Sequence, residues 1–194
     1  MISVGGRHGV ALSALLLFCH PVLVAGQEAG GRDVSALIGG LYKATRFAGG
    51  TRSMVGVKAA VVFAGGIEIG GVGIKVLEPV DISVGSGGFV ELRTGYGGIT
   101  FAKRGLLGGR IGAGFLLGAG NAEIRALPVG NQLGSDNFMV LEPEVTLELP
   151  SWGVIHGAIG AGFRFVTGVD DLPTVRADDL KGFTVTLAIV AGGP

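Results

Sequence analysis

Three glutamates and one histidine are the side chains of this chain best suited to acid–base chemistry. Glu142, Glu144 and Glu148 fall at even positions of one segment, and the next hairpin would bring His156 to the same face. A membrane hydrolase or acyltransferase would need a serine nucleophile beside this histidine and an acid. Because the face carries no serine, we expect no catalytic residue and no enzyme activity. We interpret His156 as a packing or hydrogen-bonding residue.

Acidic and glycine-rich stretches are the next candidates for ligand binding. The pairs Asp170–Asp171 and Asp178–Asp179 could offer oxygen ligands to a divalent cation, but their spacing does not match a calcium loop. The glycine-rich run at 70–73 is followed by no helical pattern, so it is not a phosphate-binding loop. The sequence therefore predicts no metal site and no cofactor.

The elements that carry these residues are predicted to be strands with two unlike faces. Around the glutamates, Met139, Leu141, Val145 and Leu147 occupy odd positions, which is the period of a β-strand. The composition is 48% hydrophobic and 15% charged, with a mean hydropathy of +0.60, whereas soluble domains are about 25% charged. After residue 26, no uncharged run reaches the ~18 residues of a membrane helix. A closed β-barrel is then the way for this chain to cross lipid.

Residues 1–26 resemble a signal peptide, with a basic start, an apolar stretch and small residues at 24–26 for cleavage. The only cysteine, Cys19, lies in this stretch, so the rest of the chain has no disulfide and no cysteine metal site. We expect an exported barrel domain of residues 27–194. It holds 14 of the lysines and arginines and all 15 acids, for a net charge of −1. It lacks the basic surface of a nucleic-acid-binding protein.

Turn signals divide the expected domain into eight segments long enough to be membrane strands. Their connections alternate between tight turns, at 65–66, 102–105 and 150–152, and long loops, at 78–87, 119–137 and 167–181. Small bacterial outer-membrane barrels show the same alternation. We therefore predict an all-β fold, an eight-stranded antiparallel up-and-down transmembrane β-barrel. The expected strands are 35–47, 53–64, 67–77, 88–101, 106–118, 138–149, 153–166 and 182–190.

Placing the apolar side of each strand against lipid puts its charged side in the lumen. An eight-stranded lumen is barely wide enough for side chains, so charges of both signs would form a hydrogen-bonded plug. Glu142 and Glu144 are expected to share one network with an arginine of this set. Phe138 falls on the inward side, whereas an aromatic residue at the membrane interface is expected to point outward. The predicted lumen charge network comprises Lys58, Glu91, Arg93, Arg110, Glu142, Glu144, Glu148, His156 and Arg164.

The residues from Lys181 to Leu187 are similar to the signal by which the barrel-assembly machinery recognises outer-membrane proteins. They comprise a polar residue, glycine, and then alternating hydrophobic residues, although the chain lacks the terminal aromatic residue of that signal. With segments such as 92–98 and 163–169, the chain resembles the small eight-stranded outer-membrane barrels of bacteria, the OmpA-like class, and especially an uncharacterised group within it. The resemblance implies a bacterial outer-membrane location and supplies no activity. The expected assembly-signal residues are Lys181, Gly182, Val185 and Leu187.

Two functions are possible, depending on whether the apolar side of the strands faces out of the barrel or into it. A non-enzymatic outer-membrane barrel would contact lipid with its apolar side and have at most slight pore activity. It would serve a structural or anchoring role, or contact a surface partner through loops 119–137 and 167–181. A soluble periplasmic barrel of the lipocalin type would instead enclose a small apolar ligand and expose its charges. The low charge content favours the first function, whose partners are outer-membrane lipid, the barrel-assembly machinery and a surface partner, with no nucleic acid.

Overall fold

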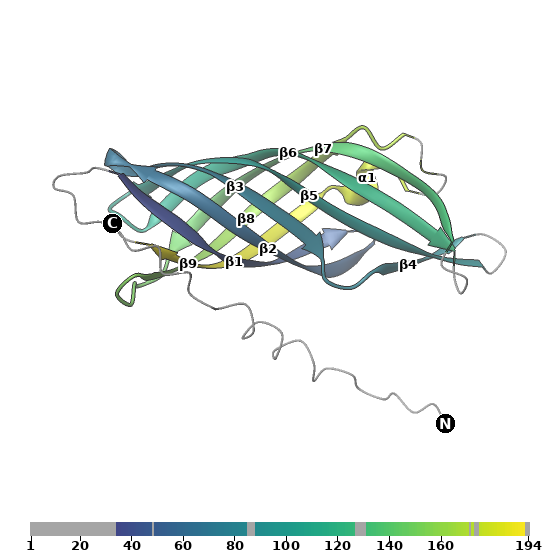
Figure 1. The fold of residues 1–194 in the computed structure, drawn as a ribbon, viewed down its shortest axis with the longest axis horizontal. Helices are drawn as coiled ribbons and strands as arrows, with labels where there is room; N and C mark the ends of the chain where they lie inside the picture. Colours follow the sequence, from purple (N-terminus) through teal and green to yellow (C-terminus); the bar gives the residue numbers. More distant parts are fainter. Residues whose placement is uncertain are drawn as a thin grey trace, which may run out of the picture. The chain divides into compact units, whose positions relative to one another are not determined.

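The computed structural model describes residues 34–47, 49–84, 88–126, 131–170, 172 and 175–192, which form nine strands and two short helical turns (Figure 1). The expected signal peptide, residues 1–26, and the start of the expected barrel domain lie outside the described residues. Among the residues described, no helix is long and apolar enough to cross a membrane. The elements are β1 (Val34–Phe47), β2 (Gly50–Phe63), η1 (Ala64–Gly66), β3 (Ile67–Val76), β4 (Val80–Val84), β5 (Gly88–Leu106), β6 (Ile111–Ala126), β7 (Gln132–Glu148), β8 (Ile155–Thr167), α1 (Ala177–Leu180) and β9 (Gly182–Gly192).

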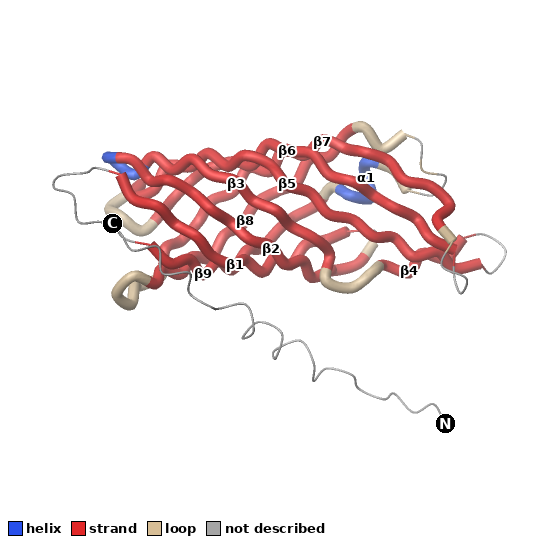
Figure 2. Tube along the Cα trace, viewed as in Figure 1, coloured by secondary structure: helices blue, strands red, loops and turns tan. Residues whose placement is uncertain are grey.

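The strands close into a barrel with eight positions. They pair in the order β3-β2-β1-β9-β8-β7-β6-β5-β4, and β3 also pairs with β5, which closes the ring (Figure 2). β3 and β4 together occupy one position in the ring. β5 pairs with β3 through residues 95–103 and with β4 through residues 88–92. Neighbouring strands are antiparallel throughout. The predicted eight-stranded antiparallel up-and-down barrel is therefore confirmed.

The two ends of the barrel differ in their connections. One end carries the short turns η1, 107–110 and 149–154, together with the start of β1 and the end of β9. Gly65, with φ 76°, supplies the left-handed backbone conformation that the η1 turn requires. The opposite end carries β4, the tip of the β6–β7 hairpin and the segment 168–181. We call these the turn end and the far end.

The strands reach further at the far end than the sequence predicted. β6 and β7 continue as a paired hairpin through most of the expected loop 119–137. The expected loop 78–87 contains β4, and the expected loop 167–181 contains α1. The tight turn predicted at 102–105 lies at 107–110 instead, because β5 is longer. The outward residues of the extended part of β6 are polar, among them Asn121, Glu123 and Arg125.

An apolar core packs inside the far end. Val80, Leu92 and Ile124 are members of this core and are 0% exposed. Phe138 also points inward, at 4% exposure, in agreement with its inward parity in the sequence. Its ring has room because Gly120 lies opposite, where an added Cβ would be 2.4 Å from Phe138 Cζ.

Candidate functional site

A belt of exposed apolar side chains surrounds the barrel between its two ends. Alternate residues of each strand point outward, so Val57 on β2 is 67% exposed and Ile99 on β5 is 54% exposed. Contact with water would cost this surface about 25 cal/mol per Å². The facing is opposite to that of a lipocalin-like barrel, whose apolar side chains would line the cavity. Other members of the belt are Ile38, Val61, Ile69, Leu117, Leu141, Val145, Leu147, Ile159, Phe165, Val185, Leu187 and Ile189.

A buried ion pair joins opposite walls of the interior. Lys43 of β1 pairs with Glu142 of β7, and their side chains are 5% and 2% exposed. Glu142 Oε2 accepts a hydrogen bond from Tyr96 Oη at 2.9 Å, and its Oε1 accepts one from Thr184 Oγ1 at 3.2 Å. Because both carboxylate oxygens are satisfied, the buried charge is compensated. We call Lys43, Tyr96, Glu142 and Thr184 the inner layer.

Arg164 of β8 adjoins the inner layer and is 3% exposed. Its Nε donates to the Leu180 carbonyl at 2.8 Å, and its Nη2 donates to Thr45 Oγ1 at 3.2 Å. The guanidinium carbon lies 5.5 Å from the centre of the Tyr96 ring and 5.7 Å from that of Phe47, in the range of cation–π contacts. Arg164 thus ties the barrel wall to the end of segment 168–181.

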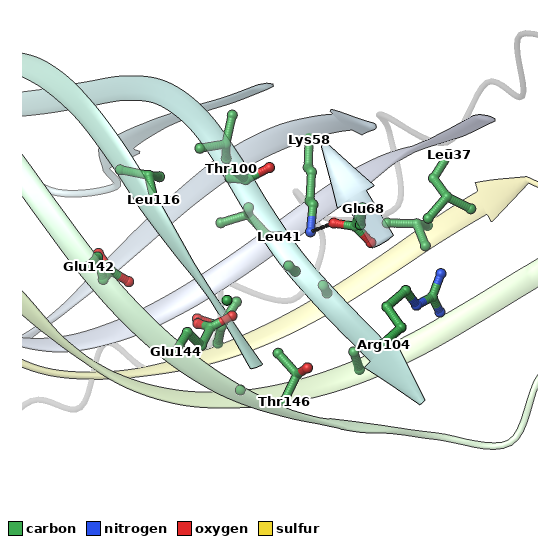
Figure 3. Close-up of a pocket in the computed structure, with 18 of the residues that line it drawn as sticks. Leu37, Leu41, Lys58, Glu68, Thr100, Arg104, Leu116, Glu142, Glu144 and Thr146 are labelled. Carbon is green, nitrogen blue, oxygen red and sulfur yellow. Dashed lines mark hydrogen bonds and ion pairs between the residues drawn. The ribbon is translucent and has the colours of Figure 1, made fainter. Parts of the chain in front are cut away.

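A cavity of about 120 Å³ extends from the inner layer toward the turn end (Figure 3). Two further ion pairs line it. Lys58 Nζ lies 2.5 Å from Glu68 Oε1, without the alignment of a hydrogen bond. Arg104 Nε donates to Glu148 Oε1 at 2.6 Å. The cavity wall therefore alternates paired charges with apolar side chains. We call this space the turn-end cavity.

Glu144 and His156 also line this wall. Glu144 Oε2 accepts a hydrogen bond from Thr186 Oγ1 at 2.5 Å. His156 Nε2 lies 3.1 Å from the Gly192 carbonyl oxygen, within hydrogen-bond reach. No serine lies among the residues that line the cavity, so the arrangement offers His156 no serine nucleophile to activate.

Several of the predicted network residues lie inside the barrel, but their partners differ from the expectation. Glu142 takes its charge partner from Lys43 and not from an arginine. Arg164 meets this group at the ring of Tyr96. The predicted residues with inward side chains are Lys58, Glu142, Glu144, Glu148, His156 and Arg164.

The lumen assignment was wrong for Glu91, Arg93 and Arg110. Arg110 lies in the exposed turn 107–110. Arg93 and Glu91 lie on the outer side of β5, where Arg93 is exposed and Glu91 is partly exposed. Leu92 between them is buried in the core. The prediction placed the apolar side of every strand against lipid. This part of β5 belongs to the far end, where the apolar side faces inward.

Sequence reasoning also missed four interior residues: Lys43, Glu68, Tyr96 and Arg104. Lys43 and Tyr96 share their inward side with apolar neighbours, which suggested a lipid-facing side. Arg104 was assigned to a turn. Glu68 could have been found, because strict alternation along β3 puts Glu68 inward and Lys75 outward without any change of phase.

Charged residues on β5 and β6 cover the outer surface of the far end. Arg93 pairs with Glu91, and Arg125 Nε donates to Glu123 Oε1 at 2.7 Å. In the ladder, Arg93 lies opposite Glu123 and Glu91 lies opposite Arg125. The four charges therefore alternate in sign across the two strands, as expected for a surface in water.

Segment 168–181 packs against the core of the far end. Val169, Leu172, Val175 and Leu180 of this segment are 2–7% exposed and belong to the same apolar cluster as the strands. The backbone N–H of Asp170 donates to Asp136 Oδ2 at 2.8 Å, which joins the segment to β7. Sequence reasoning treated the segment as a solvated loop, whereas its apolar residues close the far end of the interior.

The acidic residues of this segment form no recognisable metal site. Asp178 accepts a hydrogen bond from Lys181 Nζ at 2.6 Å, and Asp179 accepts one from the Arg176 backbone at 2.9 Å. Asp171 lies outside the described residues. In the described part of the chain, no group of three or more histidine, cysteine, aspartate or glutamate side chains could hold a metal ion.

The residues of the expected assembly signal lie at the start of β9. Gly182 begins the strand, and Val185 and Leu187 point outward, 54% and 40% exposed. β9 pairs with β1 and β8, so this strand completes the barrel. Whether these residues act as a signal stays a prediction.

The fold resembles that of small outer-membrane barrels with solved structures. Neisserial surface protein A (NspA) matches with a TM-score of 0.54 at 8% identity, over 84% of this chain and 99% of that one. The attachment invasion locus protein Ail of Yersinia pestis, solved in complex with the heparin analogue sucrose octasulfate, matches with a TM-score of 0.52 at 14% identity. That match covers 82% of this chain and 97% of Ail. No protein-family model and no curated protein matches the sequence. At these identities the likeness shows the fold alone, which is that of the predicted eight-stranded class.

Proposed function

We propose that this protein is a non-enzymatic outer-membrane barrel with a structural, anchoring or surface-contact role. The observation that carries the proposal is the continuous outward belt, in which large apolar side chains such as Val57 and Ile99 are more than half exposed. Soluble monomers rarely expose apolar surface of this extent, whereas lipid accommodates it. A closed barrel also satisfies the backbone hydrogen bonds that the membrane interior cannot.

Fractionation and refolding test the membrane proposal together. The protein should stay with outer membranes after a carbonate wash, and the purified chain should fold only when detergent or lipid is supplied. A β-rich, monodisperse protein in detergent-free buffer would overturn the proposal. The expected export signal is tested in the same preparation, because removal of residues 1–26 would give a mature chain beginning at Gln27 in its mass spectrum.

The interior supports a closed lumen with little or no conductance. Lys43 and Glu142 join opposite walls, and the apolar core occupies the far end. Ions would have to cross both, and an apolar core offers no hydration to a passing ion. In planar bilayers we expect small or absent single-channel currents. Large, stable, ohmic pores formed by the wild-type protein would contradict this part of the proposal.

The far end is the part of the molecule best placed for surface contact. It combines a charged outer surface on β5 and β6 with segment 168–181, and small barrels place their longer connections outside the cell. The neighbour Ail is named as an attachment invasion locus protein, so cell attachment is the contact role to test first. Whole cells displaying the protein should bind host cells, and replacing Glu123 and Arg125 by alanine should reduce binding without changing heat-modifiable gel mobility. Equal attachment by cells with and without the protein would exclude this role.

The stretch Lys181–Leu187 is proposed to be the assembly signal. Leu187→Asp should lower the amount of folded barrel in cells. Ile159 is the residue of β8 that pairs with Leu187. The uncharged substitution Ile159→Ala should lower the amount of folded barrel only a little. Refolding into detergent in vitro separates a signalling effect from a folding effect: a Leu187→Ala variant should refold normally in detergent yet assemble less efficiently in cells. Normal assembly of Leu187→Ala would remove Leu187 from the proposed signal.

A further inference from the structure

The charges that line the turn-end cavity do not balance. Each of its three lysine and arginine side chains pairs with a different glutamate. A fourth glutamate, Glu144, is hydrogen-bonded by the Thr186 hydroxyl and has no cationic partner among the described residues. A confined carboxylate is costly without an opposite charge, so Glu144 is the acid of this cavity best placed to meet a cationic ligand. The three pairs are Lys43–Glu142, Lys58–Glu68 and Arg104–Glu148.

The cavity also keeps space and a second acceptor for a ligand. The Glu144 carboxylate lies against Gly160, where an added Cβ would be 2.6 Å from Glu144 Cδ. The volume of about 120 Å³ far exceeds the ~10–15 Å³ that one water molecule needs. Thr100, a residue of the same lining, has a buried Oγ1 atom without a hydrogen-bond partner in the described part of the chain. Figure 3 shows Thr100 and Glu144 on different strands of this lining.

The apolar lining and the end at which the cavity opens define the kind of ligand that fits. Leu41, Val72 and Leu116 form an apolar wall of the same cavity, which suits a short alkyl group. The inner-layer pair is closed to solvent at 5% and 2% exposure, whereas the side chains of Arg104 and Glu148 are 23% and 24% exposed. The cavity therefore opens at the turn end and is closed at the inner layer.

We propose that the turn-end cavity is a binding site for a small primary alkylammonium ion that enters from the turn end. Its ammonium group donates hydrogen bonds to Glu144 and to hydroxyl oxygens of the lining, and its alkyl group contacts the apolar wall. A positive charge and N–H donors match a carboxylate that lacks a cation. This site is internal, so it is independent of the surface role proposed above.

Calorimetric titration of the refolded full-length barrel in a neutral sugar detergent tests the site, with propylammonium chloride as the probe. Wild-type protein should bind propylammonium and should not bind 1-propanol, which has the same alkyl group without charge. Glu144→Gln should weaken binding about tenfold or more, as expected for loss of a hydrogen bond to a charged group. Glu91→Gln removes the same charge from the outer surface and should leave the affinity unchanged.

A second variant keeps the charge and displaces the Glu144 carboxylate from its position. Gly160→Ala places a methyl group against the Glu144 carboxylate and should also weaken binding. Heat-modifiable gel mobility shows whether each variant folds, and Gly160→Ala is the deciding variant if Glu144→Gln does not fold. The site would be overturned if a folded variant bound propylammonium as tightly as the wild type. It would also be overturned if the wild type bound 1-propanol equally well or did not bind propylammonium.

Discussion

The belt and the far end use the same strand geometry with opposite chemistry. Along β5, Leu92 and Arg104 both point inward, whereas Arg93 and Ile99 both point outward. The alternation never changes phase between them. In the belt the apolar residue is outside and the charged residue inside, and at the far end this order is reversed. The medium outside the barrel, and not the register, therefore decides which kind of residue faces inward.

Each arrangement is stable for a different reason. At the far end, water outside favours charges there, and apolar residues of several strands and of segment 168–181 form a core like that of a soluble protein. In the belt, the outward apolar residues gain nothing from burial inside, so the interior can hold charges provided that they are paired. The Glu142 network meets this condition with Lys43, Tyr96 and Thr184.

The largest expected effect compares two glutamates with opposite facing. Glu142→Ala leaves Lys43 buried without its partner and should lower the free energy of unfolding by about 3–5 kcal/mol. Glu91→Ala removes a glutamate from the outer surface, where an ion pair is worth about 0–1 kcal/mol. Urea unfolding in detergent micelles measures both. Equal losses in the two variants would mean that the two regions do not differ in the way we describe.

Adjacent residues of β5 provide the next comparison. Leu92→Ala creates a cavity in the far-end core and should cost about 2–5 kcal/mol. Arg93→Ala, one residue away on the outer surface, should change the free energy of unfolding by about 0.5 kcal/mol or less. The same urea titration applies, with far-end opening followed separately by hydrogen exchange of the β5 and β6 amides. A stable Leu92→Ala protein with a destabilised Arg93→Ala protein would reverse the facing assigned to this part of β5.

An introduced arginine distinguishes the two outer surfaces. Val57→Arg places a charge in the belt and should cost about 2–4 kcal/mol in a bilayer. Ser135→Arg makes the same addition on the exposed outer side of β7 at the far end, where surface changes cost about 0.5 kcal/mol or less. Unfolding from lipid vesicles is the appropriate measurement, since micelles adapt to a charge more easily than a bilayer. A neutral Val57→Arg would place that residue in water and not in lipid.

The contrast between the belt and the far end also explains how much of the fold and of the interior could be predicted from the sequence. Strict alternation predicted the eight strands and the inward facing of Lys58, Glu142 and Arg164, because the belt obeys one rule along its whole height. The rule failed at Glu91 and Arg93, since nothing in a period of two says where lipid ends and water begins. The ion pair of Glu142 with Lys43 was also beyond reach. It joins β7 to β1 across the lumen, and alternation along each strand carries no information about contacts across a barrel.

The smallest expected effect concerns an ion pair in water at the far end. The hydrogen bond and charge of Lys181 lower the pKa of Asp178 below its ordinary value of 3.8. A lowered pKa stabilises the fold at pH values above the unfolded pKa, and this contribution is lost as the pH falls through the lowered pKa. Because the pair is exposed and screened by solvent, we expect no measurable change in unfolding at neutral pH when Lys181 is replaced by glutamine. Lys181→Gln should nevertheless raise the pKa of Asp178 toward 3.8 in an NMR titration of its carboxyl carbon, and Lys103→Gln at the turn end should not. A large loss of stability in Lys181→Gln at neutral pH would show that this pair behaves like the buried pairs of the interior, which would remove the distinction between the two regions.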